Sequence, residues 1–452
     1  MNPSITRSQW LASGTTVSRA VADCSDKDSF TRLSLAAKQQ DAVQRCARAA
    51  VDSGDIPGVV AQVWRNGELC CDVAAGIRDV ERKIPMDRST IFAIASMTKP
   101  VTVALALTLL DEGKLRLEDP ISRWAPEFGE MRVLLRSDGP LDDTVPAARP
   151  ITVEDLMMHR SGLAYGFMSP PPLGTALTAR LGMGIDSALT PDAWLRILSE
   201  LPLVYQPGER FNYGLSIDVL GLVAARVLGI NLRSAMRERL FAPLGMSDTD
   251  FWIPPEKRSR MAFLYQSAQP GQFVQTQVPG FTADVPPEFV SGGQGLLSTA
   301  SDYLRFARML LHDGEIGAVR VLQPATAQLL RRNRYTDAQR KQHFMMGRPF
   351  TSGIGLGVSV VTDATDPGAT GGVGSFGWAG AFGGWWQADP QEDMVLLWLQ
   401  ECTPAPPQPG AAMPRMPGMH ALGQFRKAVY DTIPARVVSQ EESNPGCADP
   451  ST

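Results

Sequence analysis

Apolar residues recur along the chain with two different periods, and the first change of period comes early. A helical period over 34–53 predicts an amphipathic helix that ends at Gly54. Two β-rich runs then flank Asn66-Gly67, a pair typical of a two-residue hairpin turn. We therefore expect the chain to open with a helix followed by an antiparallel hairpin. The apolar face of the helix comprises Leu35, Val43, Cys46, Ala50 and Val51.

The middle of the chain has helical periods and no sustained alternation of apolar and polar residues. A strong helix is predicted over 96–112, with Pro100 in the first turn, where a missing N–H costs little. The stretch from about 114 to 290 is rich in Pro and Gly. Shorter helices are predicted there over 152–159, 191–201 and 216–229. Residues 96–290 should therefore form a mostly helical domain.

Strand patterns return towards the C-terminus. A capped amphipathic helix over 298–314 precedes three predicted strands and a closing helix. Joined to the first hairpin, these strands would form one antiparallel sheet flanked by the terminal helices. The strands are predicted over 353–361, 374–390 and 393–400, and the closing helix over 420–432.

This pattern predicts the α/β class, of the α+β type, with two domains. Residues 34–95 and 291–434 would form a discontinuous α/β domain around the helical domain. Residues 1–33 are expected to be a loosely ordered extension, and 435–452 a disordered tail. Ser96 falls at the junction of the two domains, where clefts commonly form.

Candidate chemistry begins with Ser96 and Lys99, which are three residues apart at the start of the 96–112 helix. Residues at i and i+3 share one helix face, so the two side chains can touch. A serine hydroxyl becomes a nucleophile when a base takes its proton, and a lysine can be that base if its pKa is lowered. Such a pair is common by chance, because a serine there can be only a helix cap and the lysine only a solvated charge.

Two further motifs add to this pair. Tyr213 follows a Pro-Gly turn and precedes a helix, where its hydroxyl could shuttle a proton, although most tyrosines simply pack in a core. Gly377 and Gly380 flank Trp378 in a predicted strand. Glycine weakens a strand unless a backbone or a ligand must approach closely, so this edge could present an N–H group to a substrate carbonyl.

Taken together and in this order, the three motifs resemble the serine β-lactamase and penicillin-binding-protein superfamily. Within it the chain looks most like the class C β-lactamase-like esterases, also called family VIII carboxylesterases. The resemblance covers roughly residues 35–432 and implies a β-lactamase-like fold. Other similar segments are MHRSGL at 158–163, YQPGERFNYG at 205–214 and SGGQGLLSTASDYLRF at 291–306.

Two positions depart from the class C β-lactamase pattern. Leu215 stands where those enzymes usually have the Asn of Tyr-x-Asn, and Trp378-Ala379-Gly380 replaces Lys-Thr-Gly. The amide and the cation suited to a β-lactam are therefore missing. Both changes resemble the esterase branch.

The resemblance implies acyl transfer in two steps through an acyl-enzyme on Ser96. Lys99 and Tyr213 would act together as base and then acid, and their protonation states stay open. The backbone N–H groups of Ser96 and Ala381 would form the oxyanion hole. Trp378, Gly380 and Leu215 would contact the substrate. The implied activity is a carboxylesterase for short-chain, largely apolar esters, with weak β-lactam hydrolysis as a possible addition and no cofactor or metal.

The composition of the chain limits the partners and the cellular location that we expect. Hydrophobic residues make up 44% and charged residues 20%, and the net charge of −4 is spread without a basic stripe, so no nucleic-acid partner is expected. The longest apolar run, Val101 to Leu110, is too short to span a bilayer, and the start of the chain lacks a continuous apolar leader. We expect a cytoplasmic monomer or small homo-oligomer acting on a small-molecule ester, with its six cysteines free.

Four other functions are weighed against the esterase on the sequence alone. A Ser-His-Asp hydrolase is disfavoured because the chain has no G-x-S-x-G, and His159 lies in a segment resembling a structural motif. An acyltransferase would pass the acyl group to an alcohol or amine, and a β-lactamase or D-amino-acid peptidase would keep the same serine. A binding protein would have no need of all three polar residues. The apolar segment 166–184 is expected to be a mobile rim that selects small, apolar esters.

Overall fold

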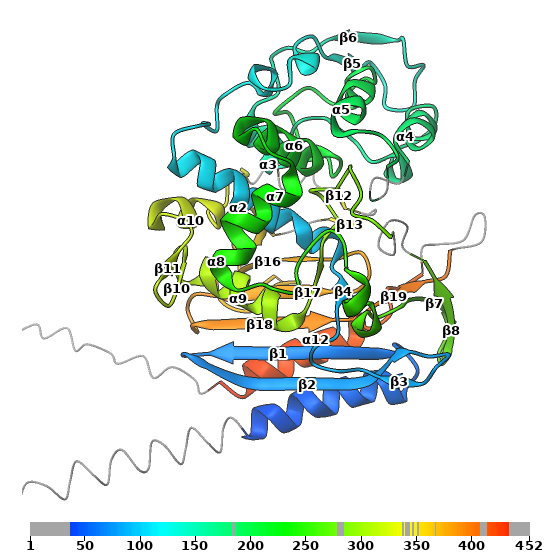
Figure 1. Cartoon of the computed structure of the whole chain (residues 1–452), viewed down its shortest axis with the longest axis vertical. Helices are drawn as coiled ribbons and strands as arrows, with labels where there is room; N and C mark the ends of the chain where they lie inside the picture. The colour runs from blue at the N-terminus through cyan, green and yellow to red at the C-terminus, as the bar shows by residue number, and fades with distance from the viewer. Residues whose placement is uncertain are drawn as a thin grey trace, which may run out of the picture.

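The computed structural model describes residues 37–433, apart from 183–184, 186, 278–283, 337–338, 340–343, 346–347, 350–351, 367 and 407–413. Figure 1 shows a sheet with its covering helices in one part of the molecule and a mostly helical part above it. The predicted extension over 1–33 and the tail over 435–452 lie outside the described residues.

One antiparallel sheet of eight strands joins the first hairpin to the C-terminal strands, as predicted. Its order is β14-β15-β16-β17-β18-β1-β2-β3. β1 and β18 lie side by side in the middle and pair from Val60 with Leu399 to Arg65 with Met394. The strands are β1 (Gly58–Arg65), β2 (Glu68–Asp79), β3 (Ile84–Pro85), β14 (Gly353–Ile354), β15 (Ser359–Val360), β16 (Phe376–Ala379), β17 (Trp385–Asp389) and β18 (Met394–Leu399).

The turns explain where the strand predictions were right and wrong. Asn66 and Gly67 have φ of 50° and 89°, the left-handed conformation that a two-residue hairpin turn requires, and Arg65 pairs with Glu68 across it. The predicted strands 353–361 and 374–390 were too long, because each is two short strands. The chain reverses at a turn in which the Gly383 N–H donates to the Gly380 carbonyl at 3.1 Å, and this separates β16 from β17.

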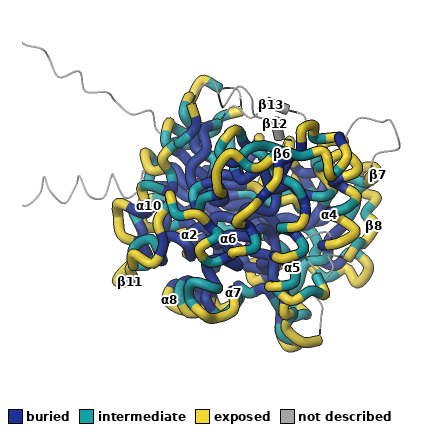
Figure 2. Tube along the Cα trace, turned by 90° about the horizontal axis from the view of Figure 1, so that it is seen from above, coloured by how far each residue is buried: buried dark blue, intermediate teal, exposed yellow. Residues whose placement is uncertain are grey.

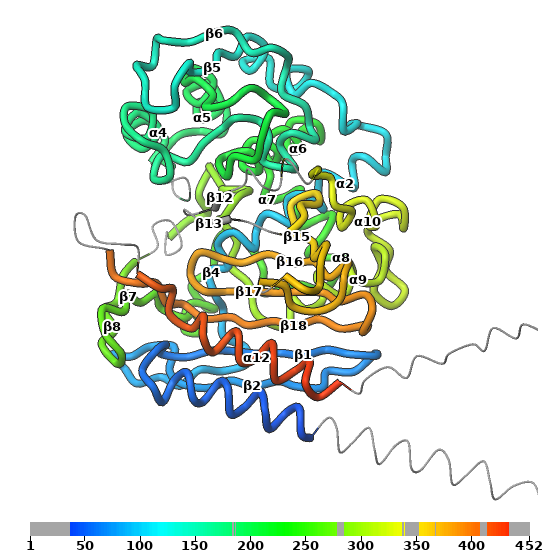
Figure 3. Tube along the Cα trace, turned by 180° about the vertical axis from the view of Figure 1, so that it is seen from behind, coloured from blue at the N-terminus to red at the C-terminus, as the bar shows by residue number. Residues whose placement is uncertain are grey.

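Both faces of the sheet are covered, which explains why its central strands are almost continuously apolar. The helix at 37–52 and α12 (Met419–Asp431) cross one face, where they pack on Val59, Ala61 and Val63 (Figure 3). Val60 and Trp64 alternate with these residues and join the core on the other face, with α9 (Ala300–Leu311). Because successive side chains of a strand point to opposite faces, the apolar residues of β1 are divided between two cores.

The helical part is centred on α2 (Thr98–Asp111), which is buried from Thr98 to Leu109. Figure 2 shows the buried trace running through the interior of the molecule. The predicted helices all occur, with ends that differ by a few residues. Predicted in this part were also α3 (Val153–Met157), α5 (Pro191–Ser199) and α6 (Ser216–Leu228). Not predicted were α4 (Leu173–Leu181), α7 (Leu232–Met236), α8 (Ala242–Leu244) and α10 (Pro324–Leu330), the 3-10 turns η1 (Ala95–Met97), η2 (Ile121–Arg123), η3 (Pro126–Phe128), η4 (Gly166–Met168) and η6 (Pro255–Arg260), and the π-helical η5 (Arg237–Phe241).

Among the described residues, no single helix is long and apolar enough to cross a membrane. One pair, Ser216–Leu228 with Leu232–Leu244, meets the length and composition criteria together but is bent by 83°. Ten residues of the first helix of this pair, from Ser216 to Ala225, are buried in the protein core.

Several short strands were not predicted. In the middle part, β7 and β8 form a hairpin, and β7 pairs in parallel with β19 from the C-terminal part. A partner so distant in sequence leaves no local signal. These strands are β4 (Phe92–Ala93), β5 (Arg132–Leu134), β6 (Thr144–Pro146), β7 (Leu264–Gln269), β8 (Gln272–Thr276), β9 (Leu297–Ser298), β10 (Glu315–Ile316), β11 (Val319–Arg320), β12 (Phe344–Met345), β13 (Arg348–Pro349) and β19 (Cys402–Pro404).

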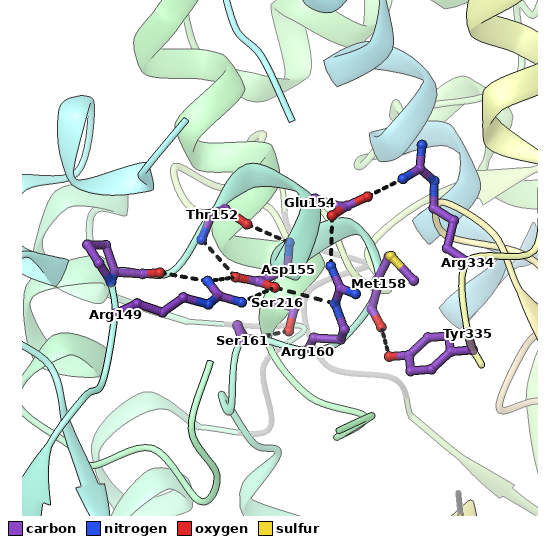
Figure 4. A network of polar contacts seen from close by, with 11 residues as sticks. Arg149, Thr152, Glu154, Asp155, Met158, Arg160, Ser161, Ser216, Arg334 and Tyr335 are labelled. Atoms are coloured by element: carbon purple, nitrogen blue, oxygen red, sulfur yellow. Dashed lines mark hydrogen bonds and ion pairs between the residues drawn. The ribbon is translucent and has the colours of Figure 1, made fainter. Parts of the chain in front are cut away.

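A buried ionic network holds α3 in place (Figure 4). Asp155 is fully buried and accepts two hydrogen bonds from Arg149, at 2.6 and 2.9 Å. It also accepts from the Thr152 N–H at 3.0 Å, while the Thr152 side chain caps the helix in return. Arg160 completes the network with one ion pair to Asp155 and another to Glu154.

Removal of Asp155 should destabilise the fold. Asp155→Ala removes an ion-pair partner of Arg160, whose side chain is mostly buried, and removes the acceptor of the Thr152 N–H in the helix cap. We therefore expect a loss of about 3 kcal/mol in the free energy of unfolding. Urea unfolding measures it. The matched control is Asp138→Ala, which breaks the exposed Arg136–Asp138 pair and should leave the urea midpoint unchanged. Equal midpoints for the two variants would contradict this role of the network.

Candidate active site

Ser96 lies in a tightly held turn rather than at a helix cap. It is the central residue of η1, and α2 begins two residues later. Ala95 has φ of 44°, a conformation that residues other than glycine rarely adopt and that commonly occurs at functional sites. The turn is fixed on both sides, because the Ile94 N–H donates to Leu296 at 3.0 Å and the Met97 carbonyl accepts from the Tyr303 hydroxyl at 2.8 Å.

The predicted contact between Ser96 and Lys99 is present. Lys99 Nζ lies 3.1 Å from Ser96 Oγ and donates a second hydrogen bond to the Gly293 carbonyl at 2.8 Å. The lysine is 0% exposed and the serine 8% exposed. In its uncharged form, an amine in contact with a serine hydroxyl can take the hydroxyl proton, which is what activation of the nucleophile requires.

Aromatic rings enclose the amine. Lys99 Nζ lies 4.6 Å from the ring centroid of Tyr213 and 5.5 Å from that of Tyr165. The Trp378 ring is a neighbour of the Tyr213 ring, with centroids 6.0 Å apart. The structure therefore brings Ser96, Lys99, Tyr213 and Trp378 into one group, although they come from three separate stretches of the chain.

The segment 158–163 positions Tyr213. The His159 carbonyl accepts from the Asn212 N–H at 2.7 Å, and the Asn212 side chain donates to the Leu163 carbonyl at 2.8 Å. Ser161 and Ser216 share a hydrogen bond of 2.8 Å between their hydroxyls. These contacts hold the loop before α6 on both sides of the tyrosine, so this motif has a structural role.

His159 itself is a buried neutral side chain. Burial, and secondarily the charge of Lys99, hold the pKa of His159 well below its usual range. Its ring lies 4.7 Å from that of Tyr213, and neither ring nitrogen has a hydrogen-bond partner among the described residues. A histidine placed in this way packs against the tyrosine, in agreement with the structural role that the sequence predicted.

Asp218 is a buried acid beside this group. It accepts hydrogen bonds from the Ser291 hydroxyl and from the Gly293 N–H, the latter at 3.0 Å. Gly293 is also the residue whose carbonyl accepts from Lys99. Burial raises the pKa of Asp218, and the charge of Lys99 together with these hydrogen bonds opposes the shift. The backbone of one residue, Gly293, therefore connects the acid to the lysine through its N–H and its carbonyl.

The other predicted site residues lie close to this group in different ways. Gly380 follows β16 and faces the Ile94 carbonyl, which a side-chain carbon on Gly380 would approach to 2.6 Å. This approach brings the β16 end, with Ala381, beside the Ser96 turn. Trp378 is buried, and Leu215 is buried at the N-terminus of α6 within the main core. The Leu215 side chain therefore offers little surface to a substrate.

Sequence reasoning missed three residues of the group: Tyr165, Asp218 and Gly293. The signal for Asp218 was a lone acid among the apolar residues that open α6. Burial, and secondarily Asp218 and Tyr213, raise the pKa of Tyr165 well above its usual range. The Tyr165 hydroxyl has no hydrogen bond of ordinary geometry among the described residues.

Comparison with known proteins agrees with this geometry. A family model described as Beta-lactamase matches residues 43–413. The chain belongs to the beta-lactamase family. It is 31% identical over 364 residues to esterase EstB of Burkholderia gladioli, an alignment that covers 76% of this chain and 85% of EstB. It is therefore a serine hydrolase of the beta-lactamase-like esterase superfamily.

Two further proteins are similar to this chain over most of its length. The uncharacterized protein MT1414 of Mycobacterium tuberculosis is 45% identical over 388 residues, which cover 84% of this chain and 95% of that protein. The solved structure of EstCE1, described as a hydrolase with promiscuous acyltransferase activity, matches with a TM-score of 0.72 at 29% identity and covers 87% of this chain and 99% of EstCE1. These similarities support ester hydrolysis or acyl transfer.

The link through Gly293 yields a prediction. Asp218→Ala removes the acceptor of the Gly293 N–H, so the Gly293 carbonyl and the Lys99 amine bonded to it should shift. We expect kcat for an ester to fall about 100-fold as a result. Asp218→Asn keeps an oxygen acceptor and should retain activity within about tenfold of the parent protein. Steady-state kinetics on folded variants measure both. Full activity of the Ala variant would show that the lysine does not depend on this acid.

Proposed function

We propose that the protein is a serine carboxylesterase that hydrolyses short-chain, largely apolar esters through an acyl-enzyme on Ser96. The observation that carries the proposal is the buried Lys99 amine, 3.1 Å from the Ser96 hydroxyl and 4.6 Å from the centre of the Tyr213 ring. A serine hydroxyl in contact with an amine can attack an ester once its proton is taken, and the Tyr213 hydroxyl is proposed to share in the proton transfers.

In the first step Ser96 Oγ bonds to the ester carbonyl carbon and its proton passes to the Lys99–Tyr213 pair. The carbonyl oxygen becomes an oxyanion, for which the N–H groups of Ser96 and Ala381 are the proposed donors. The bond to the alcohol then breaks, and the pair returns the proton to the leaving oxygen. In the second step water attacks the acyl-enzyme in the same way and releases the carboxylic acid and free Ser96.

The surroundings of the pair support an uncharged substrate. Trp378 on β16 and the backbone of Gly380 are proposed to contact the ester. The absence of a side chain at Gly380 lets the Ile94 carbonyl, next to the Ser96 turn, approach the end of β16. Leu215 supplies no polar group where an amide would hold a β-lactam side chain. We therefore propose that β-lactam hydrolysis is weak.

Acyl transfer is the second candidate. Its support is the similarity to EstCE1, described as a hydrolase with promiscuous acyltransferase activity, and the aromatic residues that surround Lys99. An apolar setting favours an alcohol over water as the second nucleophile. In that case the acyl-enzyme would form identically, and the product would be a new ester.

The test compares two substrates on one serine. We expect purified protein to hydrolyse p-nitrophenyl butyrate at least 100-fold faster, by kcat/KM, than a chromogenic cephalosporin. Ser96→Ala should abolish both rates, because the acyl-enzyme cannot form. The matched control is Ser375→Ala, a buried serine that precedes β16 and takes no part in the proposed chemistry, which should keep ester turnover if the variant folds.

Each alternative has its own outcome. Faster turnover of the cephalosporin would contradict the esterase proposal. Formation of butyl butyrate in preference to butyrate, when butanol is added, would identify a transferase. Ester turnover that survives in Ser96→Ala would contradict the assignment of the nucleophile.

A further inference from the structure

A strip of exposed apolar side chains begins next to the aromatic residues around Lys99. Phe167 is 55% and Met168 39% exposed, both in η4, and the three prolines that follow at 170–172 are exposed as well. Contact between a contiguous apolar surface and water is unfavourable, so such a surface suggests a binding site for an apolar group. The position of Phe167 relative to the reacting atoms indicates which ligand it would contact.

Phe167 is connected to the catalytic amine through one ring. Its ring stacks on that of Tyr165, with centroids 5.0 Å apart and an angle of 21° between the planes. The Tyr165 ring centroid in turn lies 5.5 Å from Lys99 Nζ. One face of Phe167 is therefore covered by a residue of the site, and the rest of the ring remains available to a molecule bound there.

The backbone that carries Phe167 is closely packed. A side-chain carbon on Gly166 would come within 2.3 Å of Thr178 Oγ1, and one on Gly174 within 2.2 Å of the Ser169 carbonyl oxygen. Hydrogen bonds from the Met168 N–H to Tyr165 and from the Gly174 N–H to Pro170 close the turn. The start of the segment 166–184 is therefore held against α4, and Phe167 is presented in a fixed place.

We propose that Phe167 is a specificity-determining residue whose ring forms the outer wall of the substrate site. It would pack on the apolar group of the ester that lies farthest from the scissile bond. The substrate class is then esters with an extended or aromatic apolar group, on either the acyl or the alcohol side, in preference to acetyl esters of small alcohols. This inference rests on the proposed esterase function and names the part of the site that sets its selectivity.

The experiment compares selectivity in Phe167→Ala and the parent protein. One series varies the acyl group, from p-nitrophenyl acetate to butyrate and hexanoate. The other varies the alcohol, from ethyl acetate to benzyl acetate, followed by acid release. We expect the preference for the larger group, as a ratio of kcat/KM values, to fall about tenfold in one series, equivalent to about 1.4 kcal/mol. The series that responds identifies the side of the ester that Phe167 contacts.

Two controls separate contact from structure. Leu135→Ala removes another apolar residue of similar exposure, 58%, in a different segment, and should leave both ratios unchanged. Phe167→Trp keeps a broad aromatic surface and should retain the preference. Thermal unfolding of each variant verifies the fold.

The outcomes are distinct. A uniform loss across all substrates would mean that Phe167 only supports Tyr165, and unchanged ratios would mean that no substrate group reaches it; both overturn the inference. If the parent protein hydrolysed no ester, the proposed function itself would fail, whatever the variants did.

Discussion

The site depends on the burial of one amine. Lys99 is fully enclosed, and an enclosed amine is tolerated only when its hydrogen bonds are satisfied or when it loses its charge. The Gly293 carbonyl and the Ser96 hydroxyl accept from it, and the faces of two tyrosines lie beside it. Each of these partners must be held in place by a different part of the fold, so the architecture can be understood from this one position.

The sheet and the helical part each hold one side of the amine. From the sheet side, Gly380 at the end of β16 approaches the Ile94 carbonyl, next to the Ser96 turn. From the helical side, the 158–163 segment holds the loop of Tyr213 through hydrogen bonds to Asn212. The ionic network around Asp155 fixes the helix from which that segment leaves. Chemistry at Ser96 therefore requires both parts to be folded together.

The sequence predicted the fold class, the order of the helices and the pairing of the first hairpin, because each has a local signal. Asn66-Gly67 specifies a turn, and the apolar period specifies α2 and α6. The spacing of Ser96 and Lys99 predicted that the two side chains touch, and the resemblance carried by the three motifs together made them the candidate nucleophile and base. The roles of Ala381, Trp378 and Leu215 stay proposals, and the structure shows Leu215 buried in the core.

What could not be predicted depends on contacts between distant segments. Tertiary packing alone brings Tyr165, Asp218 and Gly293 close to Lys99. No hydrophobic period in the sequence predicts this proximity. The parallel pairing of β19 with β7 has the same origin, since the two strands are far apart in sequence. Segment 166–184 was expected to be a mobile rim, whereas close packing at Gly166 and Gly174 holds its first residues.

The most direct test of the account is the rate at which Ser96 becomes acylated when Lys99 loses its amine. Lys99→Met keeps an unbranched apolar side chain in the core, and rapid mixing with p-nitrophenyl butyrate followed by mass spectrometry of the digested protein reports the acyl group on the Ser96 peptide. We predict that acylation slows at least about 100-fold relative to the parent protein. Acylation of Ser96 at the parent rate, or an acyl group on another residue of the active parent protein, would contradict the central claim.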